Sequence, residues 1–195
     1  MARAVVLAGF LAALLPTGVF AAPKVTVKTT TFSISGTSGT AIMAALDRKG
    51  PKHGFMSRAI AQTRYEMNSE AEWTHRDGWC MVTKPAVVID ITYVYPKLTG
   101  PVPPTLQQRW QAFMAGVTRH EKVHGRLAKE MAFAAEKALS KVRVRDDKDC
   151  RRFSAEMKRA VNAVVTDYER RQVAFDDAEH KPGSSIDRLI RKLVK

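Results

Sequence analysis

Cysteine is scarce in this chain: Cys80 and Cys150 are the only two among 195 residues, and no CxxC pair occurs. This excludes a thioredoxin-like redox motif and a zinc finger built on cysteines. Local signatures of a serine or cysteine nucleophile and a glycine-rich phosphate loop are missing as well. Any chemistry therefore has to come from other residue types.

Long apolar runs are missing beyond the first 22 residues. That N-terminal segment has one positive charge at Arg3, then an apolar stretch and a small-residue end at Ala21, which is typical of a secretory signal peptide. The alternative is an uncleaved membrane anchor, but Pro16 and Gly18 interrupt a run already shorter than the roughly 20 apolar residues that span a bilayer. We therefore expect residues 1–21 to be a signal peptide and the protein to be exported, either periplasmic or secreted, with no transmembrane helix in the mature chain.

Acidic residues are few: 19 Asp and Glu stand against 32 Lys and Arg, which gives a formal net charge of +13. So strong a positive charge favours anionic partners. For an exported protein these would be anionic envelope polymers or lipid headgroups, and no specific nucleic acid is expected. A solvated basic surface without a partner is the alternative.

The patterning that is present predicts strands in the first half of the chain and long helices in the second. The predicted strands are 24–36, 61–74 and 80–95, and the predicted helices are 41–49, 105–142 and 151–175. Asp77-Gly78 is expected to turn the second and third strands into an antiparallel hairpin. The proline-rich segment 96–104 should end the sheet, because proline cannot continue a strand.

These elements predict one α+β domain over residues 22–180, followed by a basic C-terminal tail over 181–195. We expect a small antiparallel or mixed sheet packed on a long two-helix hairpin, a zincin-like arrangement. Because an exported protein meets an oxidising compartment, the two cysteines should form a disulfide, Cys80–Cys150. It would clamp the second hairpin strand to the start of the last long helix.

The candidate chemistry lies in His120-Glu121-Lys122-Val123-His124 on the first long helix. Residues four apart lie one turn above each other, so His120 and His124 can bind a single zinc ion. Glu121, beside them, is expected to take a proton from the attacking water and pass it to the leaving amine. Both histidines fall within the apolar stripe of the helix and should face inward. The alternative, two core histidines with hydrogen-bond partners, would bury two polar rings at a cost.

A catalytic zinc ion needs a third protein ligand. Glu130 would face away from the histidines on a continuous helix, and the chain lacks the downstream histidine of metzincins. Folding the second long helix back places its far end opposite the motif. We expect His180 to be the third ligand, with its side chain on a loop after the helix. The alternatives are Asp176, Asp177, Asp167 and Glu169, and Tyr168 is a candidate hydrogen-bond donor to the oxyanion.

The chain resembles a bacterial family, the domain of unknown function 922 family, described as predicted secreted zinc-dependent proteases. The matching places are Phe32-Ser-Ile-Ser-Gly-Thr37, Arg48-Lys-Gly-Pro51, Cys80-Met-Val-Thr83, Trp110-Gln-Ala-Phe113, the His120 to Gly125 segment, Cys150 and Phe175-Asp176. In the family's late segment, Tyr-Asp-x-x-Thr-x-His-Gly, this chain differs: Glu179 replaces the threonine and His180 comes one residue early. The resemblance implies one bound zinc ion and hydrolysis of peptide bonds.

Together these features predict a secreted or periplasmic zinc-dependent metallopeptidase that acts on a protein or peptide substrate. Two alternatives remain open. One is a non-catalytic, basic envelope-binding protein with a structural metal, and the other is a peptidoglycan amide hydrolase that uses the same metal chemistry.

Overall fold

The computed structural model describes residues 22–53, 57–146 and 148–195. The expected signal peptide, 1–21, lies outside the described residues. The chain order is β1 (Lys24–Ile34), α1 (Gly39–Lys49), β2 (Lys52–His53), β3 (Ser57–Arg58), β4 (Gln62–Arg76), β5 (Trp79–Leu98), α2 (Pro104–Leu139), β6 (Arg143–Arg145), α3 (Arg151–Glu179) and α4 (Ser185–Val194). The predicted α+β class is confirmed. Among the described helices, none has the length and apolar character that a membrane span requires.

The main sheet is mixed, with strand order β1-β5-β4 and with β6 paired to β5. β4 and β5 form the predicted antiparallel hairpin, and both residues of its Asp77-Gly78 turn have positive φ, at 53° and 74°, as a type I′ turn requires. β1 runs parallel to β5, with Val25 opposite Ile89. The short pair β2–β3 was not predicted.

β5 continues through Pro96 to Leu98, so the prediction that 96–104 could not extend a strand was wrong at its start. The pairing of β4 with β5 begins at Gln62 and Val94. Beyond Val94 the strand therefore has only β1 as a neighbour, and Pro96 lies opposite Phe32 of β1. A proline without an N–H group is tolerated there because one side of the strand is unpaired.

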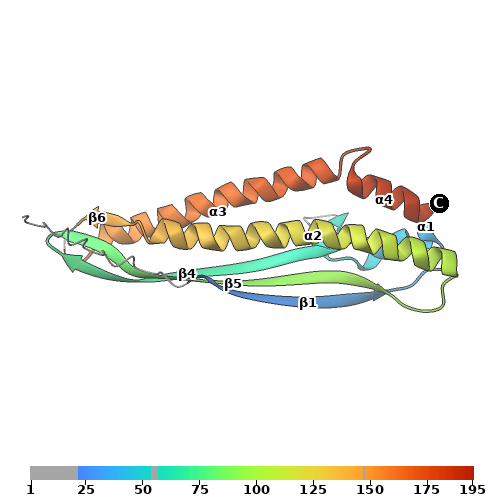
Figure 1. Cartoon of the computed structure of the whole chain (residues 1–195), viewed down its shortest axis with the longest axis horizontal. Coiled ribbons are helices and arrows are strands. Elements are labelled where there is room, and N and C mark those ends of the chain that lie inside the picture. The colour runs from blue at the N-terminus through green and yellow to red at the C-terminus, as the bar shows by residue number, and fades with distance from the viewer. Residues whose placement is uncertain (1–21, 54–56, 147) are drawn as a thin grey trace, which may run out of the picture.

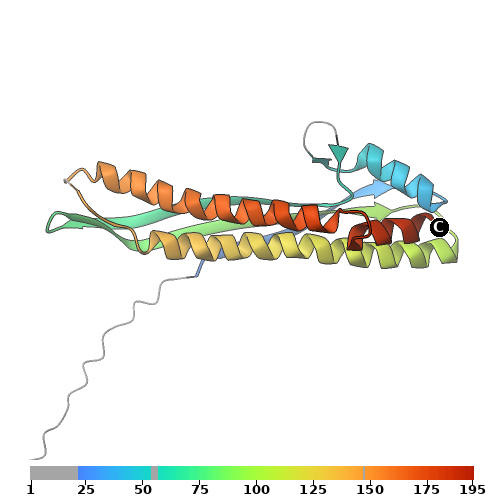
Figure 2. The ribbon, with the colours of Figure 1, turned by 90° about the horizontal axis from the view of Figure 1, so that it is seen from above.

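Helices α2 and α3 lie side by side and antiparallel along one face of the sheet (Figures 1 and 2). The inward residues of β5, among them Ile89 and Ile91, are fully buried against α2. α2 begins at Pro104 after Pro103, without a side-chain cap, so the expected start at Thr105 was close. α3 runs to Glu179, one turn beyond the predicted end at 175, so Asp176 lies within a helix and not on a loop.

The core divides into three apolar clusters. One lies where α1, α4 and the start of α2 meet, one in the middle, and one at the end that holds the disulfide. Val117 belongs to the first cluster and Ala128 to the second. The turns of α2 between them carry His120, Glu121 and His124, so these polar residues fill a gap in the apolar core.

The predicted disulfide is present: Cys80 of β5 and Cys150 are bonded, with Cα atoms 5.9 Å apart. Around it lie Val82 and Phe153, the latter fully buried. β6, unpredicted, pairs with β5 beside the bond. The sheet is thus joined covalently to the start of α3.

The segment expected as a basic tail forms helix α4, which contacts α2 and α1. Ser184 caps the helix by accepting a hydrogen bond from the Asp187 backbone N–H. Leu193 is fully buried and Ile186 nearly so, and both belong to the interior. α4 therefore forms part of the packed end of the molecule nearest the His-Glu motif.

Candidate metal centre

His120 and His124 of α2 meet Asp176 in the last turn of α3. Their side chains are 7%, 12% and 34% exposed, so the two imidazoles face inward as predicted. The Nε2 atoms of the two histidines lie 3.1 Å apart, and Oδ1 of Asp176 lies 3.1 Å from His120 Nε2 and 2.9 Å from His124 Nε2. Three donor atoms therefore form a nearly equilateral triangle.

This triangle fits a small divalent metal ion. For zinc bonds of about 2.0–2.1 Å in a tetrahedral site, neighbouring donor atoms should lie about 3.3 Å apart, close to the distances seen. Among the described His, Cys, Asp and Glu side chains, these three form a group whose ligand atoms lie close enough together to hold one metal ion. The two imidazole nitrogens and the carboxylate oxygen converge on one point, where they could hold a metal ion or, without one, share protons.

Gln172, one turn before Asp176 on α3, orients His124. Its Oε1 lies 2.5 Å from His124 Nδ1, and its Nε2 donates to the backbone oxygen of His124 at 3.1 Å. In the neutral ring, a hydrogen on Nδ1 leaves the lone pair on Nε2, the atom that faces the metal position. Sequence reasoning missed Gln172, although its spacing of four residues from Asp176 was a usable signal.

His120 is supported by packing. Its ring stacks on Phe175 with centroids 4.9 Å apart, and Phe175 also meets the edge of His124 at 5.2 Å. Nδ1 of His120 is buried and has no hydrogen-bond partner among the described residues. The phenylalanine that the family resemblance pointed to therefore holds both rings in place.

In the metal-free site the histidines and Asp176 stabilise each other's charged forms. Burial alone would raise the pKa of Asp176, but hydrogen bonds from His120 and His124 outweigh it and hold the pKa of this carboxyl well below its usual range. Burial alone would lower the pKa of His124, but its bonds to Asp176 and Gln172 more than offset this and raise it. Asp176 is therefore ionised and supplies a negative charge at the metal position.

Glu121 is buried, with 5% of its surface exposed, and is tied to the sheet. The hydroxyl of Thr63 on β4 lies 2.7 Å from Oε2 of Glu121 and 3.0 Å from its backbone oxygen. Among the described residues Oε1 has no hydrogen-bond partner. Thr63 was not predicted, because only the pairing of β4 with the core brings this strand to the helix.

Two tyrosines of β5 lie behind the motif. A Cβ atom on Gly125 would come within 1.9 Å of the Tyr93 hydroxyl oxygen, so only glycine fits where α2 crosses this side chain. Tyr95 stacks on Tyr93 at 5.9 Å, and its hydroxyl is buried without a partner in the described chain. Burial, together with the negative charge of Glu121, raises the pKa of Tyr95 to about 12.

The other predicted site residues lie at varying distances from the triangle. Nδ1 of His180 is 2.8 Å from the backbone oxygen of Asp176 and 4.0 Å from its Oδ1, with the side chain 55% exposed. His180 thus lies beside the three donor atoms and is not one of them; its role as a ligand stays a prediction. Asp167 pairs with Arg170 and Arg171.

Tyr168 packs on the middle apolar cluster, with the guanidinium of Arg171 4.5 Å above its ring. It does not line the cavity described next, whereas Tyr65 of β4 does. Burial, with the charge of Glu169 adding to it, raises the pKa of Tyr65. Tyr65 therefore joins Tyr168 as a candidate hydrogen-bond donor at the site.

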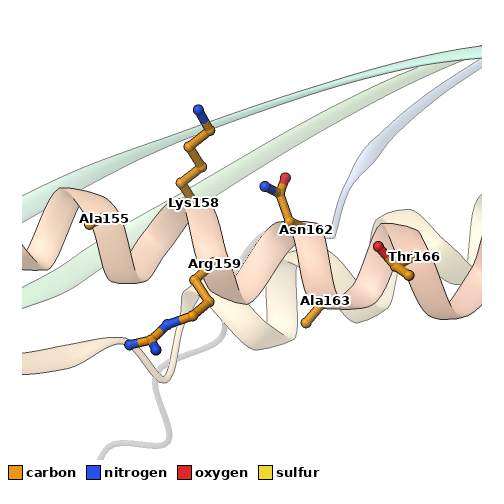
Figure 3. Close-up of a pocket in the computed structure, with 6 residues that line it drawn as sticks. All are labelled: Ala155, Lys158, Arg159, Asn162, Ala163 and Thr166. Atoms are coloured by element: carbon orange, nitrogen blue, oxygen red, sulfur yellow. The ribbon is translucent and has the colours of Figure 1, made fainter.

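A cavity of about 800 Å³ opens onto the triangle. It is lined by residues of α1, β4, α2, α3 and α4 and includes His120, Glu121, His124, Asp176 and His180. A second hollow, of about 500 Å³, is lined by Ala155, Lys158, Arg159, Asn162, Ala163 and Thr166 (Figure 3). All six belong to α3, so it is a shallow depression along one helix, away from the triangle.

An α+β fold with a His-His-Asp cluster beside a buried glutamate defines a candidate metalloprotein. The family model described as "Bacterial protein of unknown function (DUF922)" matches residues 29–183, and the chain belongs to this family. No curated protein and no solved structure matches the chain. The match includes the triangle and Glu121 but ends before α4.

Proposed function

We propose that this protein is an exported zinc-dependent metallopeptidase. The observation that carries the proposal is the triangle of His120, His124 and Asp176 beside the buried carboxylate of Glu121. The two histidines and the acid lie on two antiparallel helices, which supports a zincin-like role for this helix pair. In this proposal the third ligand is Asp176, which the sequence left open as an alternative to His180.

The three residues of the triangle would hold the ion. Zinc, when bound, supplies a Lewis acid that polarises a carbonyl and activates water at neutral pH. Glu121 is held by Thr63 through Oε2, which leaves Oε1 to accept a proton from the attacking water and return it to the leaving amine. Tyr65, on the wall of the same cavity, is placed to donate a hydrogen bond to the developing oxyanion.

A peptide substrate fits the edge of the sheet. β4 pairs with β5 on one side, and in the described part of the chain no strand pairs with its other side. Its first residues, Gln62 and Thr63, line the cavity. An extended peptide that added to this edge would place a backbone carbonyl near the triangle. This strand geometry favours a peptide over the amide bonds of peptidoglycan, although the basic surface would suit either polymer.

A structural metal is the second candidate, and the donor count speaks against it. A structural zinc site has four protein ligands, whereas a catalytic site has three and an open position. In the described chain the cluster supplies three donor atoms, and they face a cavity.

The test is hydrolysis of casein and of a mixed peptide library by the purified protein, with and without a chelator. We expect chelator-sensitive cleavage that zinc restores. Glu121→Gln should bind zinc as the unmodified protein does and lose at least about 100-fold in kcat. Cleavage that survives either the chelator or Glu121→Gln would contradict the proposal.

A further inference from the structure

The cavity beside the triangle has an apolar end, where Met43, Ile60 and Ile190 pack on the apolar cluster that holds Ala61 and Val117. Ile186 lines the cavity as well, and so do the charged residues Asp47 and Arg58. Tyr65, Glu169 and Gln172 line the polar part, next to the triangle. Ala61, Val117 and Ile186 are buried, so their contribution to the wall is fixed by the packing of the core. The apolar end is therefore a formed surface and not a chance exposure.

Two glycines allow α4 to approach its neighbours closely. A Cβ atom on Gly116 of α2 would lie 2.1 Å from Cδ1 of Leu189, and one on Gly39 of α1 would lie 2.0 Å from the backbone oxygen of Leu193. The helix thus packs closely on both neighbours. Ile186 and Ile190, one turn apart on α4, both reach the cavity. α4 therefore forms one wall of the cavity while packed on α1 and α2.

The apolar end begins within one helical turn of the triangle. Val117 precedes His120 by three residues on α2, and one turn of an α-helix rises about 5.4 Å. That is roughly the reach of one amino-acid side chain. A residue next to a bond held at the triangle would therefore place its side chain among Val117, Ile186 and Ile190.

We propose that this apolar end is the subsite for an aliphatic side chain, of leucine, isoleucine or methionine, next to the bond that is cleaved. The proposal rests on the peptidase function proposed above. It also assigns to α4 a part in specificity, although α4 lies beyond residues 29–183, which the family model matches. The preference for an aliphatic side chain would then depend on α4 as well as on the region that the family model matches.

The first test reads the cleavage sites of the zinc-loaded protein in a peptide library by mass spectrometry. One position beside the cleaved bond should be enriched in aliphatic residues. Ile190→Asp should abolish the enrichment and reduce kcat/KM for a leucine peptide at least about tenfold relative to its glycine counterpart. Lys192→Asp, which makes a larger charge change on the exposed side of α4, should change neither.

A second variant covers the case in which Ile190→Asp fails to fold. Ile190→Ala enlarges the subsite without adding a charge, and it should move the enrichment toward phenylalanine and tryptophan. An unchanged cleavage profile in a folded Ile190→Ala protein would overturn the proposal.

Binding separates this proposal from the peptidase function. In zinc-loaded Glu121→Gln, a leucine peptide should bind at least about tenfold more tightly than its glycine counterpart by calorimetry. If the unmodified protein cleaves peptides without an aliphatic preference, the subsite is wrong and the peptidase proposal stands. If it cleaves nothing while the binding preference persists, the peptidase proposal is wrong and the apolar end is a binding site for aliphatic side chains with no cleaved bond beside it. Equal binding of the two peptides overturns the subsite.

Discussion

The two ends of the α2–α3 pair are held together in different ways. At the end where α3 begins, here called the distal end, the Cys80–Cys150 bond joins α3 to the sheet covalently. The fully buried Phe153 adds apolar contacts there. At the other end α3 meets α2 through Asp176 and Gln172, whose polar atoms face two imidazoles. The contacts at the distal end are all made by the chain itself. The second end places an ionised carboxylate and two imidazoles around one point, and a cation there would join the helices as the disulfide does at the distal end.

Breaking the distal end should have the largest effect on stability. Cys80→Ser with Cys150→Ser opens a loop with a sequence separation of 70 residues, and the chain-entropy model gives a loss of about 4 kcal/mol in the free energy of unfolding. Chemical denaturation of the zinc-free proteins measures this. The zinc affinity of the fraction that remains folded should not change. A variant that lost both stability and zinc affinity would show that the two ends are coupled and not separate.

Weakening the metal end without removing a donor atom should have an intermediate effect. Gln172→Leu keeps the volume roughly constant and removes the hydrogen bond to His124 Nδ1. Loss of such a partner typically costs 10- to 100-fold in metal affinity, which competition with a zinc-binding dye would measure. Gln111→Leu, the same substitution at an exposed position of α2 that does not line the cavity, is the matched control. Equal affinities of the two variants would mean that Gln172 does not orient His124.

The smallest effect is expected at the contact between the sheet and Glu121. Thr63→Val removes the hydroxyl that lies 2.7 Å from the carboxylate while keeping the branched shape. Thr63 is a positioning residue, so we expect zinc affinity to be unchanged and kcat for peptide cleavage to fall by about threefold to tenfold. Thr63→Ser, which keeps the hydroxyl, should recover most of the rate. If Thr63→Ser were as slow as Thr63→Val, the contact would be structural only.

Much of the fold could be predicted from local patterns. Alternating apolar residues and a turn that requires positive φ are enough to specify the β4–β5 hairpin, and the count of two cysteines leaves one possible disulfide. β6 and β2–β3 could not be predicted, because strands of three and two residues carry too little pattern to separate from turns. The continuation of β5 through Pro96 depends on where its neighbour β4 begins, which only the folded sheet determines.

At the candidate site, the sequence was sufficient to predict the orientation of residues that lie on a single helix. The spacing of His120, Glu121 and His124 on α2 placed both histidines inward. The third donor comes from another helix, and its identity depends on how α3 crosses α2. Residues 176–180 were expected on a loop, which made His180 the favoured ligand. One further turn of helix brings Asp176 to the histidines and leaves His180 beside them.

Zinc binding by three variants tests the central claim most directly. Calorimetry and metal analysis should find one zinc ion per unmodified protein, and Asp176→Ala should lose at least about 100-fold in affinity. Asp177→Ala, on the next residue of α3, should bind as the unmodified protein does, and His180→Ala should lose little. No stoichiometric zinc in the unmodified protein at neutral pH, or a loss in His180→Ala that exceeds the loss in Asp176→Ala, would contradict the account.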